Sequence, residues 1–160
     1  MPKDHRRIIN LEKYQLKLKP ISPKTFLMGS PSELTAPKAI ISSSGDKLIT
    51  GSTSGQLGVT DFSGLAIKII ADLNSSISSL CSSPDNQFII AGCKNGNVYL
   101  FGDKPLTLIR SFKDHQFPVT DVSISPKNER FVSTSLDGTI NSYLLPTINK
   151  NGKSLLGITM

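Results

Sequence analysis

The residues best suited to nucleophilic or metal chemistry in this chain are two histidines, His5 and His115, and two cysteines, Cys81 and Cys93. Covalent catalysis needs a nucleophile beside a positioned base, and a metal site needs three or four clustered ligands. These four residues are scattered along the sequence and satisfy neither requirement. We therefore expect no catalytic, cofactor-binding or metal-ligating residues, and we predict that the protein is not an enzyme.

Three glycines, Gly51, Gly55 and Gly58, superficially resemble a phosphate-binding loop. Their spacing does not fit the Gly-x-Gly-x-x-Gly turn, and no Lys-Ser or Lys-Thr pair follows them. We interpret them as turn glycines.

The two cysteines fall on neighbouring predicted strands, and we expect Cys81 and Cys93 to sit roughly opposite one another around a turn at Asn86 and Gln87. Such a position is close enough in principle for a cross-strand disulfide. No export signal opens the chain, so we expect two reduced, packed thiols instead.

The elements that position these residues come from a repeated unit. The segments Ser42–Gly55, Ser83–Gly96 and Ser125–Gly138 align without a gap, and both their opening serines and their turn glycines lie 41 and then 42 residues apart. A period of roughly 40–45 residues with strand-like content is typical of β-propeller blades, with about one four-stranded blade per repeat. The sequence therefore predicts an all-β fold, a partial β-propeller of about three four-stranded antiparallel blades.

Each repeat supplies four strand candidates, because short β-branched and apolar runs alternate with turn residues. The segment Tyr14–Lys19 also alternates apolar and polar residues, as a further strand with one buried face would. In chain order, the predicted strands are Thr25–Gly29, Lys38–Ser42, Lys47–Ser52 and Gln56–Thr60, then Leu65–Ile70, Ile77–Ser82, Gln87–Cys93 and Asn97–Phe101, then Leu106–Phe112, Val119–Ser125, Arg130–Ser135 and Thr139–Leu144.

The third repeat, Asp114 to Leu145, resembles the WD-repeat propeller family over its whole length. The second keeps Ser83-Pro84-Asp85, the Asn95-Gly96 turn and a closing aromatic, Phe101, and the first places Thr60-Asp61 where that family has Trp-Asp. The resemblance covers about residues 24–146. It implies a non-enzymatic protein-protein interaction scaffold within a larger intracellular assembly.

The resemblance also implies a structural role for His115. In well-formed WD repeats this histidine hydrogen-bonds the aspartate of the tight turn, and a strand serine and the closing aromatic complete the chain. The corresponding residues here are Asp137, Ser133 or Ser135, and Tyr143. Repeats one and two lack the network, and we expect looser blades there.

We divide the chain into a basic N-terminal arm with a possible extra strand (1–23), three WD-type repeats (24–64, 65–105 and 106–146) and a tail or start of a further blade (147–160). Three blades leave an open arc, which we expect to close against a protein partner or a second copy, because exposed sheet faces and edges favour association. Sequence reasoning leaves open whether the chain is a fragment of a full propeller.

Five of the six net positive charges lie within residues 1–30, which hold seven basic and two acidic residues. Such an arm suits an acidic partner, namely RNA, an anionic membrane or an acidic protein, and the alternative is a solvated leader that only aids solubility. We expect a cytoplasmic protein, with the nucleus or the cytosolic face of the endoplasmic reticulum as alternatives.

Two other functions remain open. The arm is compatible with a ribonucleoprotein or ribosome-biogenesis WD-repeat subunit. The stretch from His115 through Val119–Val122 to Tyr143–Pro146 resembles the end of the endoplasmic-reticulum propellers that exchange guanine nucleotide on the small GTPase Sar. That resemblance implies a nucleotide exchange factor.

Overall fold

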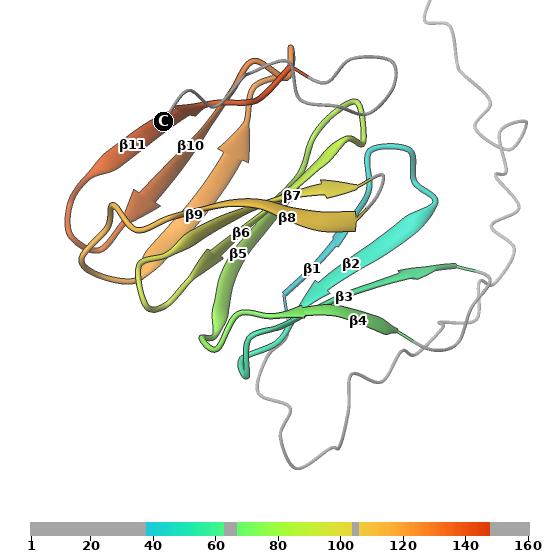
Figure 1. Ribbon diagram of the computed structural model, residues 1–160, viewed down its shortest axis with the longest axis horizontal. Helices are drawn as coiled ribbons and strands as arrows, with labels where there is room; N and C mark the ends of the chain where they lie inside the picture. The colour runs from blue at the N-terminus through green and yellow to red at the C-terminus, as the bar shows by residue number, and fades with distance from the viewer. Residues whose placement is uncertain (1–37, 63–66, 104–105, 148–160) are drawn as a thin grey trace, which may run out of the picture.

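The structure is a computed structural model that describes residues 38–62, 67–103 and 106–147. These residues form eleven β-strands in three antiparallel sheets that lie side by side in an open arc (Figure 1). The described part contains no helix, and so none that could cross a membrane. The predicted all-β, partial-propeller fold is confirmed, while the predicted strands Tyr14–Lys19 and Thr25–Gly29 lie outside the described residues.

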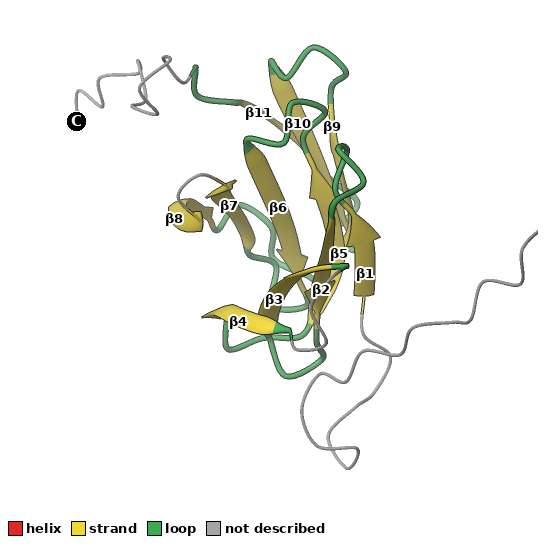
Figure 2. Ribbon diagram, turned by 90° about the vertical axis from the view of Figure 1, so that its right-hand side faces the viewer, coloured by secondary structure: helices red, strands yellow, loops and turns green. Residues whose placement is uncertain are grey.

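The three sheets follow one another along the chain. Sheet 1 holds β1 (Lys38–Ile41), β2 (Lys47–Gly51), β3 (Gln56–Asp61) and β4 (Lys68–Asp72), sheet 2 holds β5 (Ile77–Ser82), β6 (Phe88–Cys93), β7 (Val98–Asp103) and β8 (Leu106–Phe112), and sheet 3 holds β9 (Val119–Ile124), β10 (Arg130–Ser135) and β11 (Ile140–Leu144). The first strands β1, β5 and β9 contact one another from sheet to sheet, and Figure 2 shows β1 and β5 side by side. Each sheet then extends outward from its first strand in chain order.

The repeated serines explain why the first two strands of each sheet form a hairpin. The hydroxyl oxygens of Ser42, Ser83 and Ser125 accept hydrogen bonds of 2.9–3.1 Å from the backbone N–H groups five residues later, where the second strand begins. Each serine is followed three residues later by a residue with positive φ, which is Gly45, Asn86 or Asn128. Glycine and asparagine are the residues that adopt this left-handed conformation most readily.

The sheets are offset from the sequence repeats by one strand. β4 lies in the second repeat but pairs with β3, and β8 lies in the third repeat but pairs with β7. The first strand of a repeat is therefore the outer strand of the preceding sheet. The expectation that one repeat makes one blade is corrected in this respect, and sheet 3 has only three strands among the described residues.

The hydrophobic core lies between the sheets in two clusters. One joins sheets 1 and 2 around Ile49, Leu57 and Ile89, and the other joins sheets 2 and 3 around Ile90, Val98 and Phe131. Sheet 2 contributes side chains to both clusters, because consecutive residues of a strand point to opposite faces of the sheet. Every residue of β6 is accordingly buried.

The predicted position of the two cysteines is wrong. Cys81 pairs with Ile90, whereas Cys93 pairs with Ile77, so Cys81 and the residue opposite Cys93 are four positions apart along β5. Both cysteines are free thiols, as expected. Burial raises the pKa of each thiol to about 12.

Candidate functional site

The predicted network around His115 is present at the junction of sheets 2 and 3. His115 Nε2 lies 2.7 Å from Ser133 Oγ, while Nδ1 lies 3.2 Å from Asp137 Oδ2 and 2.9 Å from Thr139 Oγ1. An ionised carboxylate only accepts hydrogen bonds, so Nδ1 carries the proton that faces Asp137. In the neutral ring Nε2 then accepts from the Ser133 hydroxyl.

Tyr143 takes the place of the closing aromatic. Its ring stacks on Phe131 with a centroid distance of 4.7 Å and lies 4.4 Å from the Phe112 ring, while its hydroxyl donates to Asp114 Oδ2 at 3.1 Å. Burial raises the pKa of the Tyr143 phenol, and a hydrogen bond with Ser133 acts in the opposite direction. Tyr143 therefore closes sheet 3 through its ring contacts and its hydrogen bond to Asp114, rather than as the predicted end of the chain from His115.

Asp137 organises the turn between β10 and β11. Its carboxylate accepts hydrogen bonds from the Thr139 hydroxyl and from the backbone N–H groups of Thr139 and Gln116. These hydrogen bonds, with that of the Thr139 hydroxyl the largest, hold the pKa of Asp137 well below its ordinary value of 3.8, and the bond to His115 adds to them. Ser135 is not part of the network, because its hydroxyl donates to Phe117 O. Thr139 is the member that sequence reasoning missed.

The His115 network fixes the geometry of sheet 3. The His115 side chain is fully buried, and Ser133 is likewise inaccessible. Among the described residues, no three His, Cys, Asp or Glu side chains gather closely enough to hold a metal ion. Buried polar groups that are all hydrogen-bonded specify one packing arrangement. We therefore assign the network a structural role.

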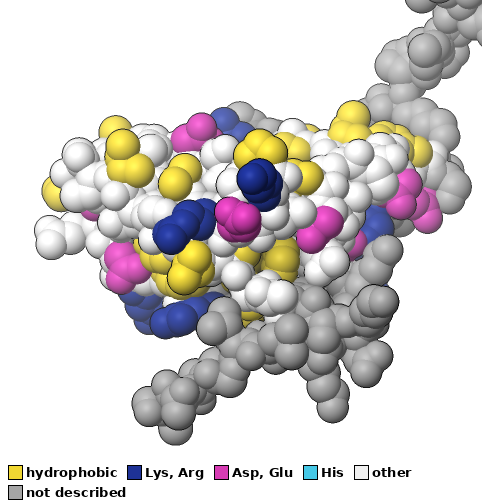
Figure 3. Space-filling model, turned by 90° about the horizontal axis from the view of Figure 1, so that it is seen from above, with side chains coloured by type: hydrophobic (Ala, Val, Ile, Leu, Met, Phe, Trp, Pro, Cys, Tyr) yellow, Lys and Arg dark blue, Asp and Glu magenta, His cyan; other side chains and the backbone are white. Residues whose placement is uncertain are grey.

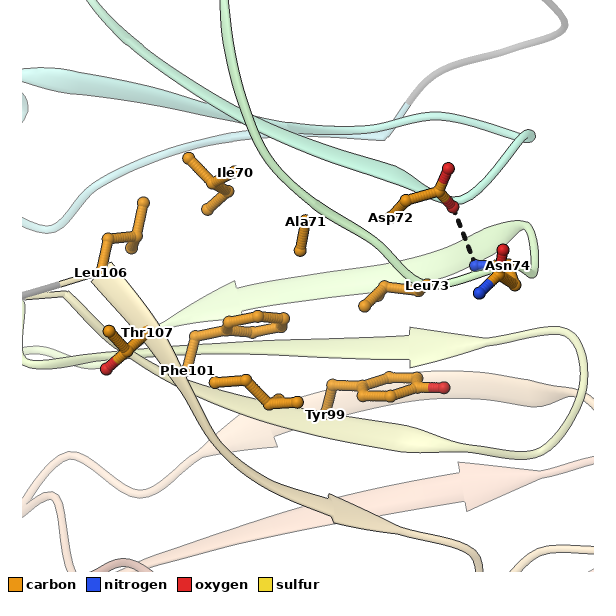
Figure 4. A pocket seen from close by; sticks show the side chains of 10 residues that line it. Ile70, Ala71, Asp72, Leu73, Asn74, Tyr99, Phe101, Leu106 and Thr107 are labelled. Carbon is orange, nitrogen blue, oxygen red and sulfur yellow. Dashed lines mark hydrogen bonds between the residues drawn. The ribbon is translucent and has the colours of Figure 1, made fainter.

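The junction of sheets 1 and 2 replaces the network by apolar side chains. Leu73, Ala91 and Phe101 stand one repeat before His115, Ser133 and Tyr143, and all three are buried in the same cluster. Figure 4 shows Leu73 and Phe101 lining a groove of about 310 Å³ beside this cluster. The absence of the network in repeat two therefore does not leave that junction unpacked, contrary to our expectation of looser blades.

Glycines on the second strands set how closely the sheets approach. A Cβ added to Gly51 would lie 2.6 Å from Ile77 Cγ2, and one added to Gly92 would lie 2.5 Å from Val119 Cγ1, so both junctions require glycine. The equivalent residue of sheet 3 is Thr134, whose hydroxyl lies 2.7 Å from that of Thr120. A further blade cannot approach sheet 3 as closely as the existing sheets approach one another.

The outer face of sheet 3 is thus open where the other sheets have a neighbour. Ile140 and Val132 are 72% and 36% exposed, whereas their equivalents in sheet 2, Val98 and Ile90, are inaccessible. Figure 3 shows hydrophobic side chains at the surface on the left of the molecule, where sheet 3 lies. This open face and the outer edge of β11 are the candidate interaction surface.

Known proteins resemble this chain in both sequence and fold. Residues 67–101 and 106–143 match the family described as WD domain, G-beta repeat (WD40). The chain is 28% identical over 102 residues to the protein groucho of Drosophila melanogaster, and the match covers 62% of this chain but only 14% of groucho. The fold is similar to the crystal structure of the computationally designed Ika4 protein, with a TM-score of 0.56 and 20% identity over 62% of this chain and 61% of that chain.

The two matches begin one residue before β4 and at the first residue of β8, which are the strands that open the second and third sequence repeats. The two matched segments, residues 67–101 and 106–143, are therefore WD40 repeats.

Proposed function

We propose that this protein is a non-enzymatic scaffold that binds partner proteins within a larger intracellular assembly. WD40 repeats generally mediate protein-protein interactions. The His115 network and the apolar cluster at the other junction both hold neighbouring sheets together, so we assign both a structural role. The function then resides in the surfaces that the three sheets present.

The observation that carries this proposal is the open face of sheet 3, which no other described sheet covers. Ile140 and Leu144 are 72% and 61% exposed on strand β11, which pairs only with β10 in the described part of the chain. Exposed apolar side chains next to an unpaired strand edge are the features that protein partners bind.

Site-specific photo-crosslinking tests the proposal. We would place benzoylphenylalanine at Ile140 in the full chain, and at Lys68 on β4 of sheet 1 as the matched control, because both side chains are exposed on strands. The scaffold function predicts that the photo-crosslinker at Ile140 captures one discrete partner protein. The yield of that crosslinked product should be lower when the crosslinker stands at Lys68. Equal, diffuse labelling at both positions would contradict it.

The same preparations address the two alternatives. A nucleotide exchange factor would accelerate nucleotide release from a Sar-type GTPase, and a ribonucleoprotein subunit would co-purify with nuclease-sensitive RNA. We expect neither activity to depend on Ile140. Either one, obtained with the intact chain and unaffected by changes on sheet 3, would replace the scaffold as the main function.

A further inference from the structure

A groove runs along the outer edge of sheet 3. It has a volume of about 580 Å³ and is lined by β8 on one side and by β10 and β11 on the other. Ile109, Arg110 and Phe112 come from β8, and Ser142, Tyr143 and Leu144 from β11. We call this the edge groove.

The edge groove lies beside β11, at the position where sheets 1 and 2 have their fourth strand. In sheet 2, the outer strand β8 pairs with β7 and forms one wall of the smaller groove of Figure 4 through Leu106 and Leu108. No described strand pairs with the outer side of β11. Alternate residues of an edge strand present unpaired backbone N–H and C=O groups, so an extended segment is the natural occupant.

The charges in the edge groove indicate what this segment carries. Arg110 and Arg130 line it from two different strands, and Asp114, its acidic residue, already accepts the hydrogen bond of Tyr143. Arg130 also stands two repeats after Lys47, whose ammonium group lies 2.7 Å from Asp103 of the neighbouring sheet. Arg130 is therefore placed for a carboxylate supplied by whatever lies beside sheet 3.

The chain's own next residues are poorly matched to this site. Counted from the turn glycines, Ile148–Ser154 corresponds to β8, but it contains Asn149, Asn151 and Gly152, which are depleted in strands. Residues 148–160 also contain two lysines and no acidic residue, so they would bring like charge to the two arginines. A segment of another protein satisfies both the strand and the charge requirement.

We propose that the edge groove binds an extended segment of a partner protein in which acidic and apolar residues alternate, and that this segment becomes the fourth strand of sheet 3. Its backbone pairs with β11, its acidic side chains point toward sheet 2 and meet Arg110, and its apolar side chains point to the open face and pack beside Leu144. Arg130, on that open face, adds to the positive charge around the groove. The inference rests on the proposed scaffold function and names the chemistry of one partner.

Fluorescence anisotropy with three labelled peptides, two of eight residues and one of thirteen, tests the inference on the full chain. One peptide alternates glutamate with valine and another alternates lysine with valine, and a third peptide has the sequence Ile148–Met160. We expect saturable binding of the glutamate peptide, weakened at high salt, and binding of the other two that is weaker by on the order of tenfold or more. Saturation should also perturb the NMR signals of the β11 amides.

Charge reversal provides the decisive variant. Arg110→Glu/Arg130→Glu should abolish binding of the glutamate peptide and gain binding of the lysine peptide. The matched control Lys38→Glu/Lys68→Glu makes the same change in net charge on two exposed residues of sheet 1 and should leave the preference unchanged. Melting temperatures of the two variants show whether either has lost its fold.

Other outcomes overturn the inference. Preferential binding of the Ile148–Met160 peptide would show that the edge groove receives the chain's own tail, and a dimer by light scattering that dissociates in Arg110→Glu/Arg130→Glu would show a second copy. Equal binding of all peptides would mean no specific site. If the partner captured at Ile140 still binds the charge-reversal variant, the edge groove is excluded while the scaffold function stands.

Discussion

Gly92 of β6 and Val119 of β9 approach so closely that a Cβ on Gly92 would lie 2.5 Å from Val119 Cγ1. This separation is shorter than any ordinary carbon-carbon contact. The relationship recurs between Gly51 and Ile77, so it is a property of both junctions. Sheet 3 ends the series with Thr134, and the described arc therefore has distinct inner junctions and a distinct outer face.

Gly92→Ala should destabilise the protein by about 1–3 kcal/mol, because the added methyl overpacks the junction of sheets 2 and 3. Urea denaturation measures the change in the free energy of unfolding. Thr134→Ala, at the equivalent position on the open face, is the control and should lie within about 0.5 kcal/mol of the parent. Adding Val119→Ala to Gly92→Ala should cost less than the two single changes together. Full additivity would contradict the close contact.

Ser133→Ala should destabilise the protein by about 1–3 kcal/mol, because it removes the 2.7 Å hydrogen bond of the buried His115 Nε2 and leaves that atom only the longer, 3.4 Å contact with Asn141 Nδ2. Thermal unfolding followed by circular dichroism measures the loss. Ser123→Ala, at an exposed position of the adjacent strand β9, is the matched control. Equal melting temperatures for the two variants would mean that the network contributes nothing to stability.

Asp137 should make the stability of the protein depend on pH in the acid range. Its pKa in the folded state lies below the ordinary value of 3.8, chiefly because of the Thr139 hydrogen bond, so folding favours the ionised form. The stabilisation is complete above about pH 4 and is lost as pH falls further, through the folded pKa. Denaturation curves between pH 6 and pH 2 should show a shallower loss of stability in Asp137→Asn. Parallel profiles for the two proteins would refute the assignment.

Cys81 and Cys93 should react slowly with a thiol reagent at pH 8 while the protein is folded. Burial raises the pKa of both thiols to about 12, and only the thiolate is nucleophilic. Timed labelling with iodoacetamide and mass spectrometry should show both sites modified rapidly only after denaturation. Rapid modification of either cysteine in the native protein would show that its surroundings are open.

The sequence predicts where strands begin and end because the turns have strong local signals. Leu106–Phe112 and Arg130–Ser135 are observed with the predicted bounds, since serine, glycine and asparagine fix the adjoining turns. The His115 network was likewise predictable, as its polar members follow the resemblance to a known family. Thr139 was missed because a threonine after an aspartate-glycine turn carries no signal that it also faces a histidine.

The grouping of strands into sheets was harder to predict from the sequence than the bounds of the strands. The apolar run of β4 could form a strand next to either β3 or β5. Its pairing with β3 therefore depends on tertiary packing. The same holds for the register that separates Cys81 from Cys93, because a shift along β5 preserves its strand character. Apolar replacements such as Leu73 for His115 also conserve packing without conserving any recognisable motif.

The central claim is that each outer strand comes from the following repeat, which leaves sheet 3 with three strands among the described residues. An engineered disulfide tests it directly. Val59 of β3 lies opposite Lys68 of β4, and directly opposed strand residues have the Cα separation that a disulfide needs. In a Cys81→Ala/Cys93→Ala background, we expect Val59→Cys/Lys68→Cys to oxidise fully to one intramolecular bridge, identified by peptide mapping. A bridge that forms instead between Lys68→Cys and Ser82→Cys on β5, with none to Val59→Cys, would contradict the account.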